Sequence, residues 1–152
     1  MTEEAQVRRL RGGDGRVWRD AVAALLSDAV DPNELISPGD VEAALDDDRC
    51  YLIVAGSNAS PVGLLSAYRF PDLAEGGCLV YLYDIEVEQG HRQRGVGTGM
   101  LETLMACCAA DDVHTIWAGT DRENEAARRL FRKTGAELAG SSYVEYEWKL
   151  QY

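Results

Sequence analysis

The chain has 152 residues, 46% of them hydrophobic and 27% charged, a balance typical of one globular domain covering residues 1–152. Its net charge of −11 disfavours a nucleic-acid partner, which requires a basic face. No stretch approaches the roughly 18 apolar residues of a membrane span. The N-terminus lacks the apolar core of a signal peptide, so we expect a cytoplasmic protein with no membrane partner.

The first half of the sequence predicts a strand, two helices and a hairpin. Apolar residues recur at helical spacing between Arg16 and Asp28. Ser37-Pro38-Gly39-Asp40 supplies the cap, the proline and the acid of a helix start. The expected elements are a strand at 7–10, helices at 16–28 and 38–45, and strands at 50–55 and 62–69.

The second half predicts strands and helices in alternation. Gly135 closes the last helix as a glycine cap. The expected elements are strands at 79–88, 114–119 and 143–150 and helices at 97–109 and 124–135. The 97–109 helix is expected to bury Val96, Met100, Leu101, Leu104 and Met105. The whole order is β-α-α-β-β-β-α-β-α-β, which indicates an α/β (α+β) fold around one mixed central sheet.

The segment Arg92-Gln93-Arg94-Gly95-Val96-Gly97-Thr98 joins a predicted strand to a predicted helix. The first turn of a helix offers unpaired N–H groups and a favourable dipole, so such a junction is an anion site. The glycines would let a phosphate approach the backbone, and the arginines would add cationic donors. The segment lacks both the P-loop ending and the dinucleotide spacing. A glycine-rich turn without a ligand is the alternative.

The spacing Arg-x-x-Gly-x-Gly resembles the acetyl-CoA pyrophosphate loop of the Gcn5-related N-acetyltransferase (GNAT) superfamily, and the element order resembles that of the same superfamily. The resemblance implies acetyl-CoA as cofactor, with its pantetheine arm in a splay of the sheet. A family pattern, Asn-x-x-Ala-x-x-x-Tyr, is matched by Asn124 and Ala127, with Phe131 in place of the tyrosine. The implied cofactor contacts are Ile85, Val87, Arg92, Gln93, Arg94, Gly95, Val96, Gly97, Thr98, Asn124, Ala127 and Phe131.

A closer resemblance covers residues 62–104. The segments Val62–Tyr68, Tyr81–Val87 and His91-Arg92 resemble the gentamicin-type aminoglycoside 3-N-acetyltransferases. This resemblance implies acetylation of the 3-amino group of an aminoglycoside, and hence antibiotic resistance. Composition and periodicity say nothing about the substrate.

Acetyl transfer to an amine requires the neutral amine. An amine with a pKa of ~10.4 costs about 4.6 kcal/mol to deprotonate at pH 7, so a base is useful. Strand alternation is expected to place Leu82, Asp84 and Glu86 on one face, opposite Tyr81 and Tyr83. We predict Asp84 as the amine-orienting base and Glu86 as the second candidate. A structural ion pair is the alternative role for Asp84.

Acidic residues dominate the segment 28–48, which has eight carboxylates and no lysine or arginine. Such a segment attracts a polycationic small molecule, although a solvated helix surface has the same composition. On the last strand the acids alternate with apolar residues, of which Tyr146 and Trp148 are expected in the core. The candidate substrate contacts are Asp28, Asp31, Glu34, Tyr83, Glu145 and Glu147.

Several other functions stay open. The four cysteines form no Cys-x-x-Cys pair and lie far from the two histidines, so we expect no metal site. Phe131 cannot donate a proton. Water or another tyrosine, with Tyr83 and Tyr143 as candidates, would therefore protonate the departing thiolate, or the step needs no dedicated acid. Acetylation of a polyamine or of a protein amine is an alternative, and so is a non-catalytic acyl-CoA-binding module. An apolar last strand would also suit a homodimer interface.

Overall fold

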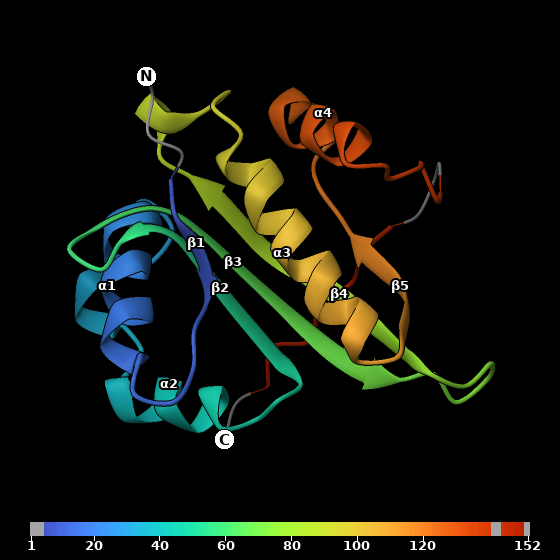
Figure 1. Ribbon diagram of the computed structural model, residues 1–152, viewed down its shortest axis with the longest axis horizontal. Helices are drawn as coiled ribbons and strands as arrows, with labels where there is room; N and C mark the ends of the chain where they lie inside the picture. Colours follow the sequence, from blue (N-terminus) through green and yellow to red (C-terminus); the bar gives the residue numbers. More distant parts are fainter. Residues whose placement is uncertain (1–4, 141–143, 151–152) are drawn as a thin grey trace.

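The computed structural model describes residues 5–140 and 144–150. These residues form one five-stranded mixed sheet and four α-helices, which confirms the expected α/β class (Figure 1). The strands are β1 (Val7–Arg9), β2 (Cys50–Ser57), β3 (Ser60–Pro71), β4 (Cys78–Val87) and β5 (Val113–Ala118). The helices are α1 (Gly15–Leu25), α2 (Pro38–Leu45), α3 (Val96–Ala110) and α4 (Glu125–Lys133), with short 3-10 turns η1 (Pro32–Glu34) and η2 (Gln89–His91).

The sheet follows the chain order β1-β2-β3-β4-β5. Neighbouring strands are antiparallel except β4 and β5, which are parallel. Helix α3 covers one face of the sheet, and α1 and α2 cover part of the other (Figure 1). Strands β2 and β3 are therefore buried on both faces and read as continuous apolar runs.

Two apolar clusters hold these layers together. Each fully buried side chain in them contributes about 1.5–3 kcal/mol to folding. The cluster under α3 includes Tyr51, Ile53, Leu65, Val80, Met100 and Leu104. The cluster under α1 and α2 includes Trp18, Val22, Val41, Leu52, Val54 and Leu64.

The predicted cap of α2 is present. Ser37 Oγ accepts a hydrogen bond from the N–H of Asp40 at 3.1 Å, and Pro38 is the first helical residue. The start of α1 is satisfied differently, because the carboxylate of Glu42 accepts hydrogen bonds from the N–H groups of Gly13 and Gly15. One acid of the 28–48 segment therefore joins α2 to α1.

A polar network joins the end of α3 to the sheet. Arg69, on β3, donates to the hydroxyl of Tyr51 at 2.8 Å and pairs with Asp111 at 3.0 Å and with Asp48 at 3.3 Å. Tyr51 in turn donates to Asp111 at 2.8 Å. Burial, followed by this hydrogen bond, raises the pKa of Tyr51 to about 12. The network ties the end of α3 to the central strands β2 and β3.

Strand β4 leaves β5 halfway along its length. The residues of β4 that pair with β5 are Cys78 to Leu82. Among the described residues, the rest of β4 (83–87) has a strand partner only on the β3 side. Helix α4 lies at the end of the molecule where the strands part (Figure 1). This opening is the splay implied by the sequence resemblance.

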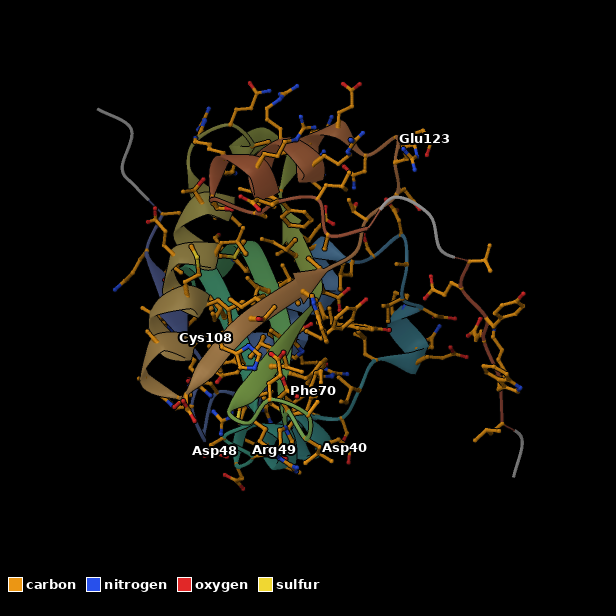
Figure 2. All side chains as sticks on the ribbon, turned by 90° about the vertical axis from the view of Figure 1, so that its right-hand side faces the viewer. Asp40, Asp48, Arg49, Phe70, Cys108 and Glu123 are labelled. Atoms are coloured by element: carbon orange, nitrogen blue, oxygen red, sulfur yellow. The ribbon has the colours of Figure 1, made fainter. Side chains whose placement is uncertain are left out.

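Two expectations about buried residues are wrong. The described part of the predicted last strand, 144–150, has no regular secondary structure, and Tyr143 lies outside the described residues. The apolar side chains of the segment 144–150 are 72–80% exposed: Val144, Tyr146, Trp148 and Leu150. This segment stands away from the sheet (Figure 2). Alternation makes a strand only where an edge accepts it. On α3, Met105 is exposed, although the other four residues of the predicted stripe are buried.

Within residues 5–140 and 144–150 no helix is both long and apolar enough to span a membrane.

Candidate active site

The loop before α3 has the backbone form of an anion site. Gly95 is the N-cap of α3 and has a φ of +81°, a left-handed conformation that favours glycine. The N–H groups of the first turn of α3 have no partners inside the helix. A hollow of about 410 Å³ lies between this turn and β1, and it is lined by Ala5, Val7, Arg94, Gly95, Val96, Thr98, Gly99, Glu102 and Thr103. Among the described residues Arg94 has no ion-pair partner, which leaves its guanidinium available to an anion.

Gly97 has a packing role that the loop pattern does not predict. A Cβ at this position would lie 2.8 Å from Cδ2 of Leu130 on α4. Glycine here lets α4 pack directly on the first turn of α3.

Arg92 turns back toward β4. Its Nε donates to the carbonyl of Val87 at 3.1 Å, and its guanidinium pairs with Glu86 Oε1 at 3.1 Å. The first predicted phosphate ligand and the second predicted base are therefore partners of each other. Glu86 is thereby held at the end of β4 beside the loop.

A bulge in β4 changes the expected faces of this strand. Asp84 pairs with Ser66 across the sheet, but Leu82 pairs with Ala67, so Tyr83 is an extra residue between them. Leu82 consequently packs under α3, while Tyr81, opposite Tyr68, shares the α1/α2 face with Asp84. The expectation that Leu82 and Asp84 share a face is wrong, because simple alternation does not allow for the extra residue.

Asp84 has a polar partner inside the sheet. Ser66 Oγ donates to Asp84 Oδ2 at 3.2 Å. Ser66 is 1% exposed and is the only buried polar residue among the described core positions. Asp84 forms no ion pair with a described residue, so the alternative of a structural ion pair finds no partner there. Its carboxylate is half-buried at the point where β4 leaves β5.

Helix α4 faces the splay with one side and solvent with the other. Asn124 is its N-cap and accepts a hydrogen bond from the N–H of Ala127 at 3.1 Å. Phe131 is half-buried and packs against the cluster under α3. Asn124, Ala127 and Phe131 therefore lie on the helix implied by the resemblance. The side-chain oxygen of Asn124 is used in capping that helix.

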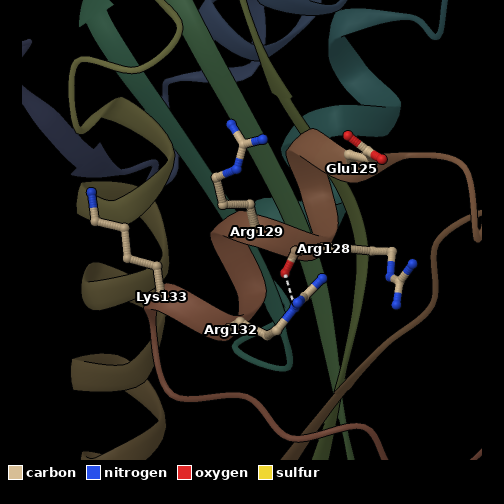
Figure 3. A pocket seen from close by; sticks show the side chains of 5 residues that line it. All are labelled: Glu125, Arg128, Arg129, Arg132 and Lys133. Atoms are coloured by element: carbon tan, nitrogen blue, oxygen red, sulfur yellow. Dashed lines mark hydrogen bonds between the residues drawn. The ribbon is translucent and has the colours of Figure 1, made fainter.

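The same helix is strongly basic, which the sequence analysis did not single out. Its side chains surround a hollow of about 550 Å³ (Figure 3). Arg132 Nε donates to the carbonyl of Arg128 at 3.4 Å. The spacing places Arg129 and Lys133 on one side of the helix and Arg128 and Arg132 on another. The lining residues are Glu125, Arg128, Arg129, Arg132 and Lys133.

Six acids of the 28–48 segment differ in their exposure and in their contacts. Asp28, Asp31 and Glu34 are exposed, and Asp31 caps η1 by accepting from the N–H of Asn33 at 2.8 Å. The acids at 42, 47 and 48 are used in caps and ion pairs within the chain. Glu145 and Glu147 are exposed on the segment that stands away from the sheet.

Three ligating side chains gather elsewhere. Atoms of Asp72, Glu75 and His114 lie within 4.8 Å of one another, and His114 Nε2 is 3.0 Å from Asp72 Oδ2. The N–H groups of Glu75 and Ala74 lower the pKa of Asp72, and His114 lowers it further. This ion pair joins the β3–β4 loop to the start of β5, away from Asp84.

Known proteins share this architecture. A structure of the aminoglycoside acetyltransferase meta-AAC0020, from an uncultured soil metagenomic sample and in complex with sisomicin, matches 97% of each chain with a TM-score of 0.82 and 17% identity. A structure of AAC(6')-Iy with the bisubstrate analog CoA-S-monomethyl-acetylneamine matches 96% of this chain and 99% of that one, with a TM-score of 0.76 and 19% identity. At these identities the likeness establishes the fold.

A curated relative is an L-2,4-diaminobutyric acid acetyltransferase from Streptomyces anulatus. It is 29% identical over 80 residues, which are 52% of this chain and 44% of that protein. The chain thus spans less than half the length of this relative.

The residues at the start of α3 fit a bound diphosphate. Gly95 opens the first turn, Arg94 is free of protein partners within the described residues, and a hollow lies beside both. The sequence profile of the acetyltransferase (GNAT) family matches residues 18–136, which is more than half of the chain. The chain therefore belongs to the acetyltransferase (GNAT) family, whose cofactor is acetyl-CoA.

Proposed function

We propose that this protein transfers an acetyl group from acetyl-CoA to the 3-amino group of an aminoglycoside. The observation that carries the proposal is the position of Asp84. A half-buried carboxylate without an ion-pair partner among the described residues lies where β4 leaves β5, and Ser66 holds it there. A carboxylate at this position meets the need for a group that receives a substrate ammonium.

Three regions of the chain would hold the coenzyme. The first turn of α3 and Arg94 would bind its phosphates, while the free edge of β4 near Ile85 and Val87 would accept its extended arm as a strand would. On α4, Phe131 would pack against that arm. Lys133 and Arg129 would add positive charge beside α3. Bound acetyl-CoA supplies the acetyl group as a reactive thioester.

Asp84 would orient the acceptor amine and remove its proton. A carboxylate in direct contact with an ammonium holds it charged, so the proton would leave through water to Asp84. Glu86, paired with Arg92, would add negative charge nearby. The hydroxyl of Tyr83, whose side chain is 65% exposed, would return a proton to the thiolate. Phe131 cannot serve in that step.

The acidic composition supports a polycationic acceptor. Asp28, Asp31 and Glu34 are exposed on the segment that follows α1, on the α1/α2 side of the sheet, and the chain carries a net charge of −11. One structure with the same fold is named an aminoglycoside acetyltransferase and holds sisomicin, and another holds the bisubstrate analog CoA-S-monomethyl-acetylneamine. The acetylated position and resistance rest on the sequence resemblance.

A small diamine is a second candidate acceptor. The curated relative named for L-2,4-diaminobutyric acid favours it. A diamine would use the same carboxylate but would leave most of the acidic surface without a partner. A protein amine would require an open groove beside Asp84.

The test is thiol release from acetyl-CoA by the purified protein. Sisomicin, gentamicin, spermidine, 2,4-diaminobutyric acid and a lysine-containing peptide are offered in parallel. We expect turnover with the two aminoglycosides at kcat/KM values at least about 100-fold above those of the other amines. NMR of the product then identifies the acetylated nitrogen. Turnover with diaminobutyric acid alone would contradict an aminoglycoside acceptor and identify a small diamine as the substrate. Binding of acetyl-CoA without turnover of any amine would support a non-catalytic module.

A further inference from the structure

Aromatic side chains gather on the sheet face that carries Asp84. They come from three adjacent strands, β3, β4 and β5, and each is 38–65% exposed. Large aromatic residues on a folded domain are usually buried, and a contiguous exposed group of them marks a binding surface. We call this group the aromatic platform: Tyr68, Phe70, Tyr81, Tyr83 and Trp117.

The strand register places these rings together. Tyr68 pairs with Tyr81 across β3 and β4, and Tyr81 pairs with Trp117 across β4 and β5. Ring centroids are 6.0 Å apart for Tyr68 and Tyr83 and 6.3 Å apart for Tyr81 and Tyr83, both in edge contact. Phe70 and Trp117 are 6.2 Å apart. The ring contacts form two groups, and the pairing of Tyr81 with Trp117 places these groups side by side on one face.

The bulge joins this surface to Asp84. Without the extra residue Tyr83, strand alternation would place Tyr81 and Asp84 on opposite faces. With it, Tyr81 and Asp84 share a face, and Tyr83 stands between them in sequence while contacting both Tyr68 and Tyr81. One end of the platform is thus the carboxylate proposed to receive the amine.

We propose that the aromatic platform binds the ring faces of a cyclic, ammonium-bearing acceptor. Its rings would stack on the apolar C–H faces of a sugar or aminocyclitol, a contact that a linear polyamine cannot make. This inference rests on the proposed function and adds a selectivity to it. Carboxylates alone attract any polyamine, whereas the platform favours cations carried on rings over linear ones.

The kinetic test compares leucine and phenylalanine at two platform positions. Tyr83→Leu and Trp117→Leu remove an aromatic face, whereas Tyr83→Phe and Trp117→Phe retain one. We expect the leucine variants to raise the KM for sisomicin about 2- to 12-fold, the range that one aromatic stacking contact supports. The KM for acetyl-CoA stays unchanged. In the phenylalanine variants the KM for sisomicin stays within about 2-fold of the wild-type value. Tyr83→Phe lowers kcat if the Tyr83 hydroxyl donates the proton to the thiolate.

Two controls separate stacking from general effects. Met105→Ala removes an exposed apolar side chain from α3, on the opposite side of the sheet, and should leave the KM for sisomicin unchanged. Spermidine, which has no ring, should bind the leucine variants as it binds wild type. An equal loss of both amines in Trp117→Leu would contradict the proposal.

Tryptophan fluorescence gives a binding readout that does not need turnover. A Trp148→Phe background leaves buried Trp18 and half-exposed Trp117 as emitters. We expect acrylamide to quench Trp117, and sisomicin to protect it and change its emission. No binding of any cyclic amine by wild type would overturn both the platform and the proposed function. Binding that leaves Trp117 emission and the leucine variants unaffected would overturn the platform alone.

Discussion

Replacing Gly97 with alanine tests whether α3 and α4 pack together because this residue has no side chain. The added Cβ would lie 2.8 Å from Leu130 Cδ2 and 3.3 Å from Leu130 Cδ1. Overpacking of this kind costs about 1–3 kcal/mol, while alanine in place of a helical glycine returns about 0.5–1 kcal/mol. Leucine methyl groups can rotate away, so we expect a net loss of about 1 kcal/mol in the free energy of unfolding.

A double-mutant cycle with Leu130→Ala isolates the contact. Urea denaturation gives the free energy of unfolding of the wild type, both single variants and the double variant. With the leucine methyl groups removed, Gly97→Ala should become stabilising by about 0.5–1 kcal/mol, so the sign of its effect reverses. Because α4 is displaced by the added methyl group only in the Gly97→Ala single variant, acetyl-CoA binding weakens in that variant. It recovers in the double variant. The same effect of Gly97→Ala in both backgrounds would refute this account of the packing.

Three further predictions concern polar groups. Ser66→Ala removes the hydrogen bond to Asp84 and should lower kcat/KM about 10-fold, equivalent to about 1.4 kcal/mol, with acetyl-CoA binding unchanged in calorimetry; an unchanged kcat/KM would exclude Ser66 as a positioning residue. Arg69→Met leaves Asp111 without its cation and should lower the free energy of unfolding by roughly 3 kcal/mol in urea; a loss below about 0.5 kcal/mol would mean that the network is only a surface feature. Because the pKa of Tyr51 is raised to about 12 from 10.0, its stabilisation is present below pH 10 and is lost as the pH rises toward 12. Tyr51→Phe should flatten that alkaline decline, and an identical decline in the variant would assign it to other groups.

Local patterns predict the elements that position the site. Ser37 and Pro38 place the start of α2 correctly, and Gly95 and Gly135 mark the beginning of α3 and the end of α4. Each of these residues acts on the backbone next to it, so its effect is visible in a short window of sequence.

Features that depend on distant partners could not be predicted in the same way. The bulge at Tyr83 appears only when β4 pairs with β3, and it reverses the expected face of Leu82. The packing of Leu130 against Gly97 cannot be predicted from the loop sequence alone. The segment 144–150 has the alternation of a strand but pairs with no strand among the described residues. In each case a contact far along the chain decides the outcome.

The role of Asp84 is the central claim, and Asp84→Asn tests it most directly. The substitution keeps the shape and a hydrogen-bond acceptor for Ser66 while removing the charge and the base. Thiol release with sisomicin and calorimetric binding of acetyl-CoA are measured on the same preparation. We predict a fall in turnover of at least about 100-fold with unchanged acetyl-CoA binding. Turnover close to wild type, or a parallel loss of acetyl-CoA binding, would contradict the account.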